Sequence, residues 1–301
     1  MEEFEHKLQL SRMDIEEAGS NPVKLAEEIH KQLDGSGSIG AVPIESIAKA
    51  LDIIEIRAEP LDTFEGALIT TQQRTVGKVL VNSLSAAPRR RFTIAHELCH
   101  FLNPWHRPLQ NTDSESTFLC TKTDMGGWSA RMKQTRHDQQ EREANRFAIE
   151  LLAPSHLIKA NLEHSADLQH VLAVSKQLNI SKEAAARRYV ELHEECIAIA
   201  FSRDDRLRYW VSNDGFPKTI IAKDQTMPWL PQETDVRKPT DLHEINPSDW
   251  FAMLNDGQAF VQTYYQQHGY AMSLLIVENH HDAEDHSVTD SVDWYSSFDR
   301  R

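Results

Sequence analysis

The chain has 301 residues, enough for about two domains, and its 40% hydrophobic and 26% charged residues are ordinary for a globular protein. A net charge of -14 disfavours non-specific attraction to nucleic acid, and a mean hydropathy of -0.53 without a long apolar run argues against membrane spans. No secretory signal is visible, and three cysteines make no disulfide framework, so we expect a cytoplasmic protein.

The first half of the chain predicts a mixture of helices and strands after a flexible N-terminus, residues 1–20. Asn21 and Pro22 begin a helix, because asparagine caps helices and proline suits the first helical position. A second helix fits residues 44–53. Strands are predicted at 53–57, 66–70 and 76–82, followed by a buried helix between Pro88 and Pro104 and another helix at 138–152.

The stretch between the last two helices, residues 104–137, has no clear period and is expected to be a functional or disordered loop. Two helices are predicted within 165–193, around Asn179-Ile180-Ser181, in a pattern that resembles a helix-turn-helix. Strand patterns follow at 196–202, 207–212, 218–222 and 271–279, with an apolar-faced segment at 249–267.

These patterns predict an α+β protein in three parts. A domain over 21–160 precedes a helix-turn-helix-like segment over 161–194 and a β-rich α+β domain over 195–280. The acidic tail, 281–301, is expected to be disordered. The tryptophans of the C-terminal domain, Trp210, Trp229 and Trp250, are more typical of a core than of a pocket.

The segment FTIAHELCHFL, residues 92–102, contains the pattern H-E-x-x-H. On a helix His96 and His100 lie one turn apart on the same face, so both imidazoles can bind one cation while Glu97 acts as a general base. With 15 histidines, chance would produce this pattern in roughly one such chain in fifteen or twenty. Because a buried helix would otherwise desolvate these groups at a high cost, the context favours a metal site.

A catalytic zinc ion usually takes a third protein ligand, and the helix at 138–152 offers Glu141. Asn145 lies one turn further and is expected to orient a ligand. An alternative role for Glu141 is a capping box, with Asp138 as the N-cap. Rival third ligands are Glu143, His106 and His137.

Other roles at this site stay open at the level of sequence. His106, His137 and Arg91 are candidates for stabilising an oxyanion or contacting the substrate. A substrate strand is expected to pair with an exposed sheet edge at 77–82. Cys99 follows the motif closely, but a small buried residue is a better interpretation than a redox switch or a metal ligand.

The two motif segments, RRRFTIAHELCHFL and EREANRFAIELLAP, resemble the ImmA/IrrE family of metallopeptidases, which share a zincin-like core. The resemblance covers about residues 22–156 and includes Gly66 and the VLVN strand. It implies zinc held by His96, His100 and Glu141, with Glu97 as the base, although ligand type alone does not exclude Mn²⁺ or Fe²⁺. Cys99 departs from the glycine common at that place.

The resemblance also implies a protein substrate, a helix-turn-helix repressor, cleaved in a stress, mobile-element or toxin-antitoxin-like switch. The alternative is a transcriptional regulator that binds DNA or protein through the helix-turn-helix-like segment. Its basic residues, Lys176, Lys182, Arg187 and Arg188, are offset by acidic neighbours, so DNA is not the favoured partner. The C-terminal domain is expected to act as a sensor or a docking surface.

Overall fold

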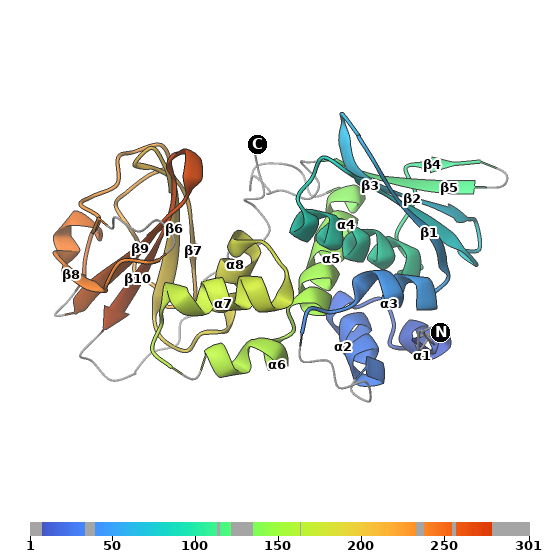
Figure 1. Ribbon diagram of the computed structural model, residues 1–301, viewed down its shortest axis with the longest axis horizontal. Helices are drawn as coiled ribbons and strands as arrows, with labels where there is room; N and C mark the ends of the chain where they lie inside the picture. Colours follow the sequence, from blue (N-terminus) through green and yellow to red (C-terminus); the bar gives the residue numbers. More distant parts are fainter. Residues whose placement is uncertain are drawn as a thin grey trace, which may run out of the picture. The chain divides into compact units, whose positions relative to one another are not determined.

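The computed structural model describes residues 8–33, 40–112, 115–121, 135–162, 164–232, 238–254 and 257–278 (Figure 1). The chain divides into two compact units. The first contains the residues up to Pro154 together with Gln177–Ser181, and the second contains Ser155–Lys176 and the described residues from Lys182 onward. The α+β fold class is confirmed, with one sheet in each unit.

The helices of the first unit follow the predicted order. They are α1 (Arg12–Glu17), α2 (Pro22–Leu33), α3 (Ile44–Ala50), α4 (Ala87–Leu102) and α5 (Arg136–Leu152). Asn21 caps α2, since its Oδ1 accepts from two amides of the first turn. Helix α1 lies within the N-terminus that we expected to be flexible, and it forms because Ser11 caps it and Ile15 is fully buried. Residues 1–7 lie outside the described ranges.

The sheet of the first unit has five strands in the order β1-β3-β2-β5-β4. They are β1 (Ile53–Glu59), β2 (Phe64–Thr71), β3 (Gly77–Asn82), β4 (Gln110–Asn111) and β5 (Glu115–Thr121). Strands β1 and β3 are parallel, and the other neighbours are antiparallel. Helix α4 packs against β2 and β3 and also against α5, which lies on the same side of the sheet (Figure 1).

Two sequence predictions about this sheet were wrong. Strand β3 lies between β1 and β2, so residues 77–82 form no exposed edge. Strand β5 lies within the stretch that we expected to be irregular. Its alternation of buried and half-exposed residues, with Ser116, Phe118 and Cys120 buried, is a strand pattern that the small polar residues concealed.

The second unit begins with three helices: α6 (Ser155–Ile158), α7 (Leu168–Leu178, of which the last two residues belong to the first unit) and α8 (Lys182–Leu192). An antiparallel sheet follows in the order β7-β6-β10-β9-β8. Its strands are β6 (Ile197–Arg203), β7 (Arg206–Ser212), β8 (His243–Ile245), β9 (Gln258–Tyr265) and β10 (Tyr270–Glu278). Short 3-10 turns at Lys159–Asn161, Pro247–Asp249 and Gln267–Gly269 complete the unit.

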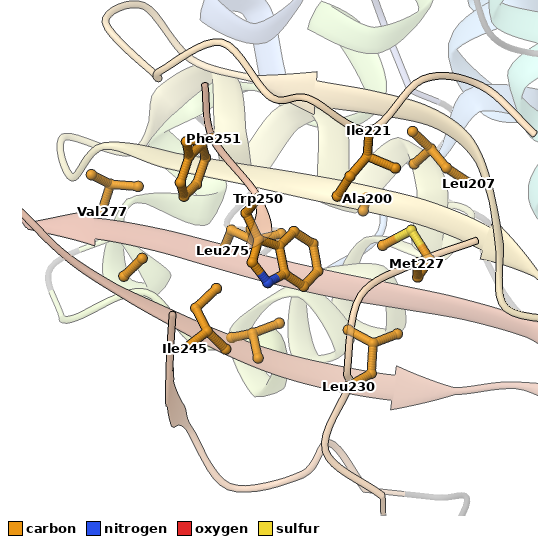
Figure 2. Close-up of a cluster of buried hydrophobic side chains, with 12 residues drawn as sticks. Ala200, Leu207, Ile221, Met227, Leu230, Ile245, Trp250, Phe251, Leu275 and Val277 are labelled. Carbon is orange, nitrogen blue, oxygen red and sulfur yellow. The ribbon is translucent and has the colours of Figure 1, made fainter. Parts of the chain in front are cut away.

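One face of this second sheet is covered by the connection between β7 and β9. Trp250 is almost fully buried there beside Met227, Leu230 and Leu275 (Figure 2). Residues 218–222, predicted as a strand, form only an isolated bridge between Thr219 and Phe251. The alternating apolar pattern of that segment instead reflects the packing of Ile221 in the hydrophobic core.

Helices α7 and α8, both confirmed, belong with the second sheet rather than to a segment of their own. The Leu168 amide donates to the Gln262 side chain of β9, and α8 packs on β6 and β7. The Arg187 guanidinium lies 5.1 Å from the ring centre of Tyr209, and the Lys182 ammonium lies 5.1 Å from that of Tyr264. Both cations therefore contribute contacts with aromatic rings within the second unit.

Within the described part of the chain, no helix is long and apolar enough to cross a lipid bilayer. The acidic tail at 281–301, for which disorder was expected, lies outside the described residues.

Replacing Trp250 with alanine is expected to lower the free energy of unfolding of the second unit by about 3–5 kcal/mol, because a large buried side chain leaves a cavity. The matched control is Trp229→Ala, since Trp229 is 62% exposed. Chemical denaturation followed by circular dichroism measures both variants. Equal losses in the two variants would contradict the core shown in Figure 2.

Candidate metal centre

Helix α4 carries the H-E-x-x-H pattern in the interior of the first unit. Pro88 stands in its first turn, and the chain leaves the helix at Asn103, which is extended before Pro104. All residues from Phe92 to Leu102 are buried, and His96, Glu97 and His100 are fully so. The helix therefore presents two imidazoles and a carboxylate to the protein interior, where each needs a polar partner.

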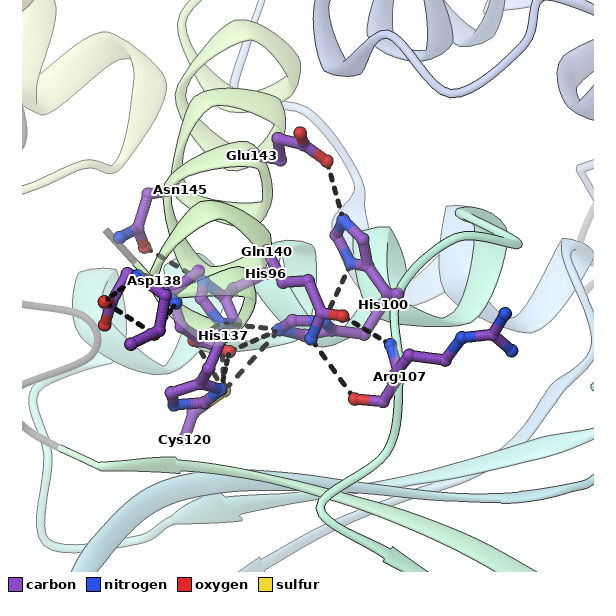
Figure 3. A network of polar contacts seen from close by, with 12 residues as sticks. His96, His100, Arg107, Cys120, His137, Asp138, Gln140, Glu143 and Asn145 are labelled. Carbon is purple, nitrogen blue, oxygen red and sulfur yellow. Dashed lines mark hydrogen bonds and ion pairs between the residues drawn. The ribbon is translucent and has the colours of Figure 1, made fainter. Parts of the chain in front are cut away.

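Four possible ligand atoms converge beside this helix: His96 Nε2, His100 Nε2, Cys120 Sγ and the carboxylate of Glu141 (Figure 3). The two imidazole nitrogens are 3.1 Å apart, and they lie 3.1 and 3.4 Å from the Oε2 and Oε1 atoms of Glu141, respectively. The Cys120 sulfur is 2.9 Å from His96 Nε2, 3.9 Å from His100 Nε2 and 3.6 Å from Glu141 Oε2. All four side chains are buried.

This donor set fits a zinc ion in both chemistry and size. Imidazole, thiolate and carboxylate are the zinc ligands of proteins, at about 2.0–2.3 Å from the metal, so the edges of a tetrahedral site measure roughly 3.3–3.7 Å. The six separations between the four groups range from 2.9 to 3.9 Å and span that value. The cluster therefore has the dimensions of a tetrahedral metal site.

Strand β5 contributes a contact that the sequence analysis missed. Phe118 and Cys120 stand on the same face of β5, and the Phe118 ring stacks on His100 at 5.1 Å. Cys120 pairs in register with Gly66 of β2. No spacing in the sequence links Cys120 to the histidines, because only the pairing of β5 with β2 brings it there. The sequence offers only a weak signal for this face, the apolar Phe118 and Cys120 two residues apart.

Helix α5 supplies Glu141, and its cap explains why that residue is available. Thr135 is the N-cap, and its side chain and that of Asp138 form a reciprocal capping box. Asp138 is therefore the third residue of the helix and not the cap, so the capping-box interpretation of Glu141 was wrong. Glu141 lies almost one turn later, and its side chain points into the cluster.

Both histidines are oriented through their second nitrogens. His96 Nδ1 donates to Asn145 Oδ1 at 2.9 Å, which is the contact through which Asn145 would orient this ring. His100 Nδ1 lies 2.9 Å from His106 Nδ1, and His106 Nε2 lies 3.0 Å from Glu143 Oε2. With the proton of His100 on Nδ1, a chain of donors runs from His100 to His106 to Glu143. This arrangement keeps His100 Nε2 free of a proton on the side of the cluster.

Hydrogen bonds from two other segments hold the loop that carries His106. Arg74, in the turn between β2 and β3, donates to the carbonyls of Asn103 and His106, and its guanidinium lies 5.4 Å from the Phe118 ring centre. Gln140 of α5 accepts from the Arg107 amide at 2.6 Å and donates to the Arg107 carbonyl at 3.2 Å. Burial lowers the pKa of Arg74 to about 10, so it remains charged at neutral pH.

The remaining candidate site residues lie in different places relative to the cluster. Arg91 donates to the Val42 carbonyl at 2.7 Å, and it lies about 140° around α4 from His96, on a different face of the helix from the cluster. His106 is 1% exposed and contacts Nδ1 of His100, on the side of that ring away from the four possible ligand atoms. Glu143 holds His106 instead of a metal. His137 is 49% exposed, with Nδ1 at 3.7 Å from Glu141 Oε1, and it is the candidate that lies at the rim of the cluster.

The protonation states of the cluster follow from burial and from Glu141. Burial opposes charge on His96, but the hydrogen bond and charge of Glu141 outweigh it and raise the pKa of His96. Burial lowers the pKa of His100 to about 4, so that imidazole is neutral at physiological pH. The pKa of Glu141 lies well below its usual range, because the two histidines outweigh the effect of burial. The shifts of His96 and Glu141 both favour an imidazolium–carboxylate pair when no cation is bound.

Gly66 explains how Glu97 fits between α4 and the sheet. A Cβ atom on Gly66 would lie 2.3 Å from Thr93 Cγ2 and 3.0 Å from Glu97 Oε1. Only glycine lets α4 approach β2 this closely. The Glu97 carboxylate thus lies over Gly66, whose partner across the strands is Cys120.

Comparison with models of protein families identifies the domain that carries this cluster. Residues 52–189 match the model of the IrrE N-terminal-like domain, a peptidase family. The chain carries an ImmA/IrrE-family domain. The match runs from the start of β1 into α8, and it includes all four groups of the cluster. No curated protein matches the chain. The resemblance seen in the sequence is thus confirmed, and the ImmA/IrrE family indicates a zinc metallopeptidase.

Zinc affinity is expected to fall as the pH is lowered from about 8 to about 6. His96 holds a proton below its raised pKa, and a cation must displace that proton to bind. Competition with a chromophoric chelator measures the affinity, and the Cys120→Ala variant removes any contribution of the thiol. An affinity that stays constant over this range in the variant would contradict the proposed His96–Glu141 pair.

Gly66→Ala is expected to destabilise the first unit by about 1–3 kcal/mol, because the new methyl group displaces Thr93 and Glu97. The control is Gly40→Ala, since a Cβ at Gly40 meets nothing within 4 Å. Thermal unfolding measures both effects. A Gly66→Ala variant as stable as Gly40→Ala would show that the approach of α4 to β2 is not constrained here.

Proposed function

We propose that this chain is a zinc-dependent endopeptidase that cleaves a helix-turn-helix transcriptional repressor. The observation that carries the proposal is the convergence of His96, His100 and Glu141 within an ImmA/IrrE-family domain, together with the buried Glu97 carboxylate that lies over Gly66, the strand partner of Cys120. The family resemblance supports the choice of substrate, and with it a role in a stress, mobile-element or toxin-antitoxin-like switch. The predicted cytoplasmic location suits such a substrate.

In the proposed reaction His96, His100 and Glu141 hold the zinc ion, which supplies Lewis acidity when bound. Glu97 takes the proton of the attacking water and passes it to the leaving amine. Asn145 and His106 keep the two imidazoles in their orientations, through the contacts at 2.9 Å. His137 is the residue that we assign to the substrate carbonyl, because it stands half exposed next to Glu141.

Glu97→Gln is expected to lower the rate of repressor cleavage by about 10²–10⁴-fold, since the amide cannot accept the proton. Zinc content should be unchanged, because Glu97 is not among the four ligand groups. The assay incubates the zinc-loaded protein with the helix-turn-helix protein encoded nearest to it and resolves the fragments by mass spectrometry. The exposed Glu27 on α2 gives the control, Glu27→Gln.

A chelator should abolish the same cleavage, and added zinc should restore it. Cleavage by the Glu97→Gln variant at the normal rate would exclude Glu97 as the base. An intact repressor under every condition, combined with a shift of its operator DNA by the full-length protein, would instead support the alternative function of a DNA-binding regulator.

A further inference from the structure

We propose that Cys120 is a fourth protein ligand of the metal ion, and that the conformation described here is a latent form of the peptidase. This inference rests on the proposed function and adds a regulatory step to it. In this form the Cys120 thiolate occupies the coordination position that the attacking water needs. Cleavage then requires Cys120 to leave the metal.

The geometry singles out Cys120 among the three cysteines. Its sulfur lies within 3.9 Å of His96 Nε2, His100 Nε2 and a Glu141 oxygen, and its side chain is fully buried. Cys99 is equally buried, but its sulfur faces the Glu143 carbonyl at 3.8 Å, away from the cluster. Cys196 contacts the Gly215 carbonyl in the second unit.

Four ligands leave no open position on a tetrahedral zinc ion. Catalytic zinc sites keep three protein ligands and one position for water, whereas sites with four protein ligands are closed. His96, His100 and Glu141 already make the open kind of site, and Cys120 adds the fourth corner of the tetrahedron. A thiolate is also a stronger ligand for zinc than water, so it competes effectively for that corner.

Strand pairing holds the thiol in this place. Cys120 pairs with Gly66 and Phe118 pairs with Leu68, so the register of β5 on β2 aims Phe118 and Cys120 at the two histidines. A shift of one residue would turn both side chains to the opposite face of the sheet. Opening of the site therefore needs either a displacement of the end of β5 or a change at the sulfur, while the three other ligands remain on α4 and α5.

Cobalt substitution tests the ligation without any substrate. The full-length protein loaded with Co²⁺ is expected to show a near-ultraviolet thiolate-to-cobalt charge-transfer band that disappears in Cys120→Ala and persists in the control Cys99→Ala. Circular dichroism shows whether each variant is folded, and Cys120→Ser serves if the alanine variant is not. A wild-type spectrum without this band, in a protein that binds cobalt, overturns the inference.

Acetohydroxamic acid, a bidentate metal ligand, tests whether the fourth position is closed. It should perturb the cobalt spectrum of Cys120→Ala at a concentration at least about tenfold lower than that needed for the wild type, because no thiolate must be displaced. Equal response of the two proteins overturns the latent form. Repressor cleavage by zinc-loaded Cys120→Ala should be correspondingly faster than that by the wild type.

The outcomes separate the two proposals. If no variant binds cobalt or zinc, the proposed metallopeptidase function fails. If the wild type cleaves the repressor at the rate of Cys120→Ala and shows no thiolate band, the function stands and the fourth ligand is excluded. If the thiolate band is present and neither protein cleaves, Cys120 is a ligand of a structural metal site, and both the latent form and the peptidase are excluded.

Discussion

The first unit is organised around the cost of burying charged and polar groups in a helix. An isolated carboxylate or imidazolium inside a protein costs several kcal/mol unless it is paired. Helix α4 buries His96, Glu97 and His100 completely, and Glu141 is almost as deeply buried on α5. The neighbouring elements supply the partners: α5 provides Glu141 and Asn145, and the loop after α4 provides His106. Helix caps and hydrogen bonds in turn hold each of these elements in place.

The sheet limits how closely helix α4 can approach it. Gly66 lets α4 lie close above β2, and the register of β5 then puts Phe118 and Cys120 against the histidines. A cation can replace the pairing of His96 with Glu141 without any rearrangement of the helices, because the four groups already have tetrahedral spacing. The same packing that brings the possible metal ligands together also places the thiol where, in the proposed latent form, it opposes hydrolysis.

The second unit follows a different principle, because its sheet is covered on both faces by apolar and aromatic side chains. The connection around Trp250 packs on one face, and α8 packs with its cations over tyrosine rings. Helices α7 and α8 have the lengths and the turn of a helix-turn-helix, yet their contacts are those of a domain core. A resemblance to a helix-turn-helix is therefore not enough to assign DNA binding to this segment.

The sequence by itself determined the helices of the site, because proline boundaries, apolar periodicity and the H-E-x-x-H spacing are local signals. It likewise indicated Glu141 and Asn145, since one helical turn relates them, and it predicted the family domain that the comparison confirmed. Only the tertiary structure decided that β3 is internal, that β5 exists within an apparently irregular stretch, that Arg91 and His106 are not among the converging ligand atoms, and that Cys120 joins the cluster. The physical reason is that strand order and register are set by pairing between distant segments, and a short strand of serine and threonine carries almost no local hydrophobic pattern.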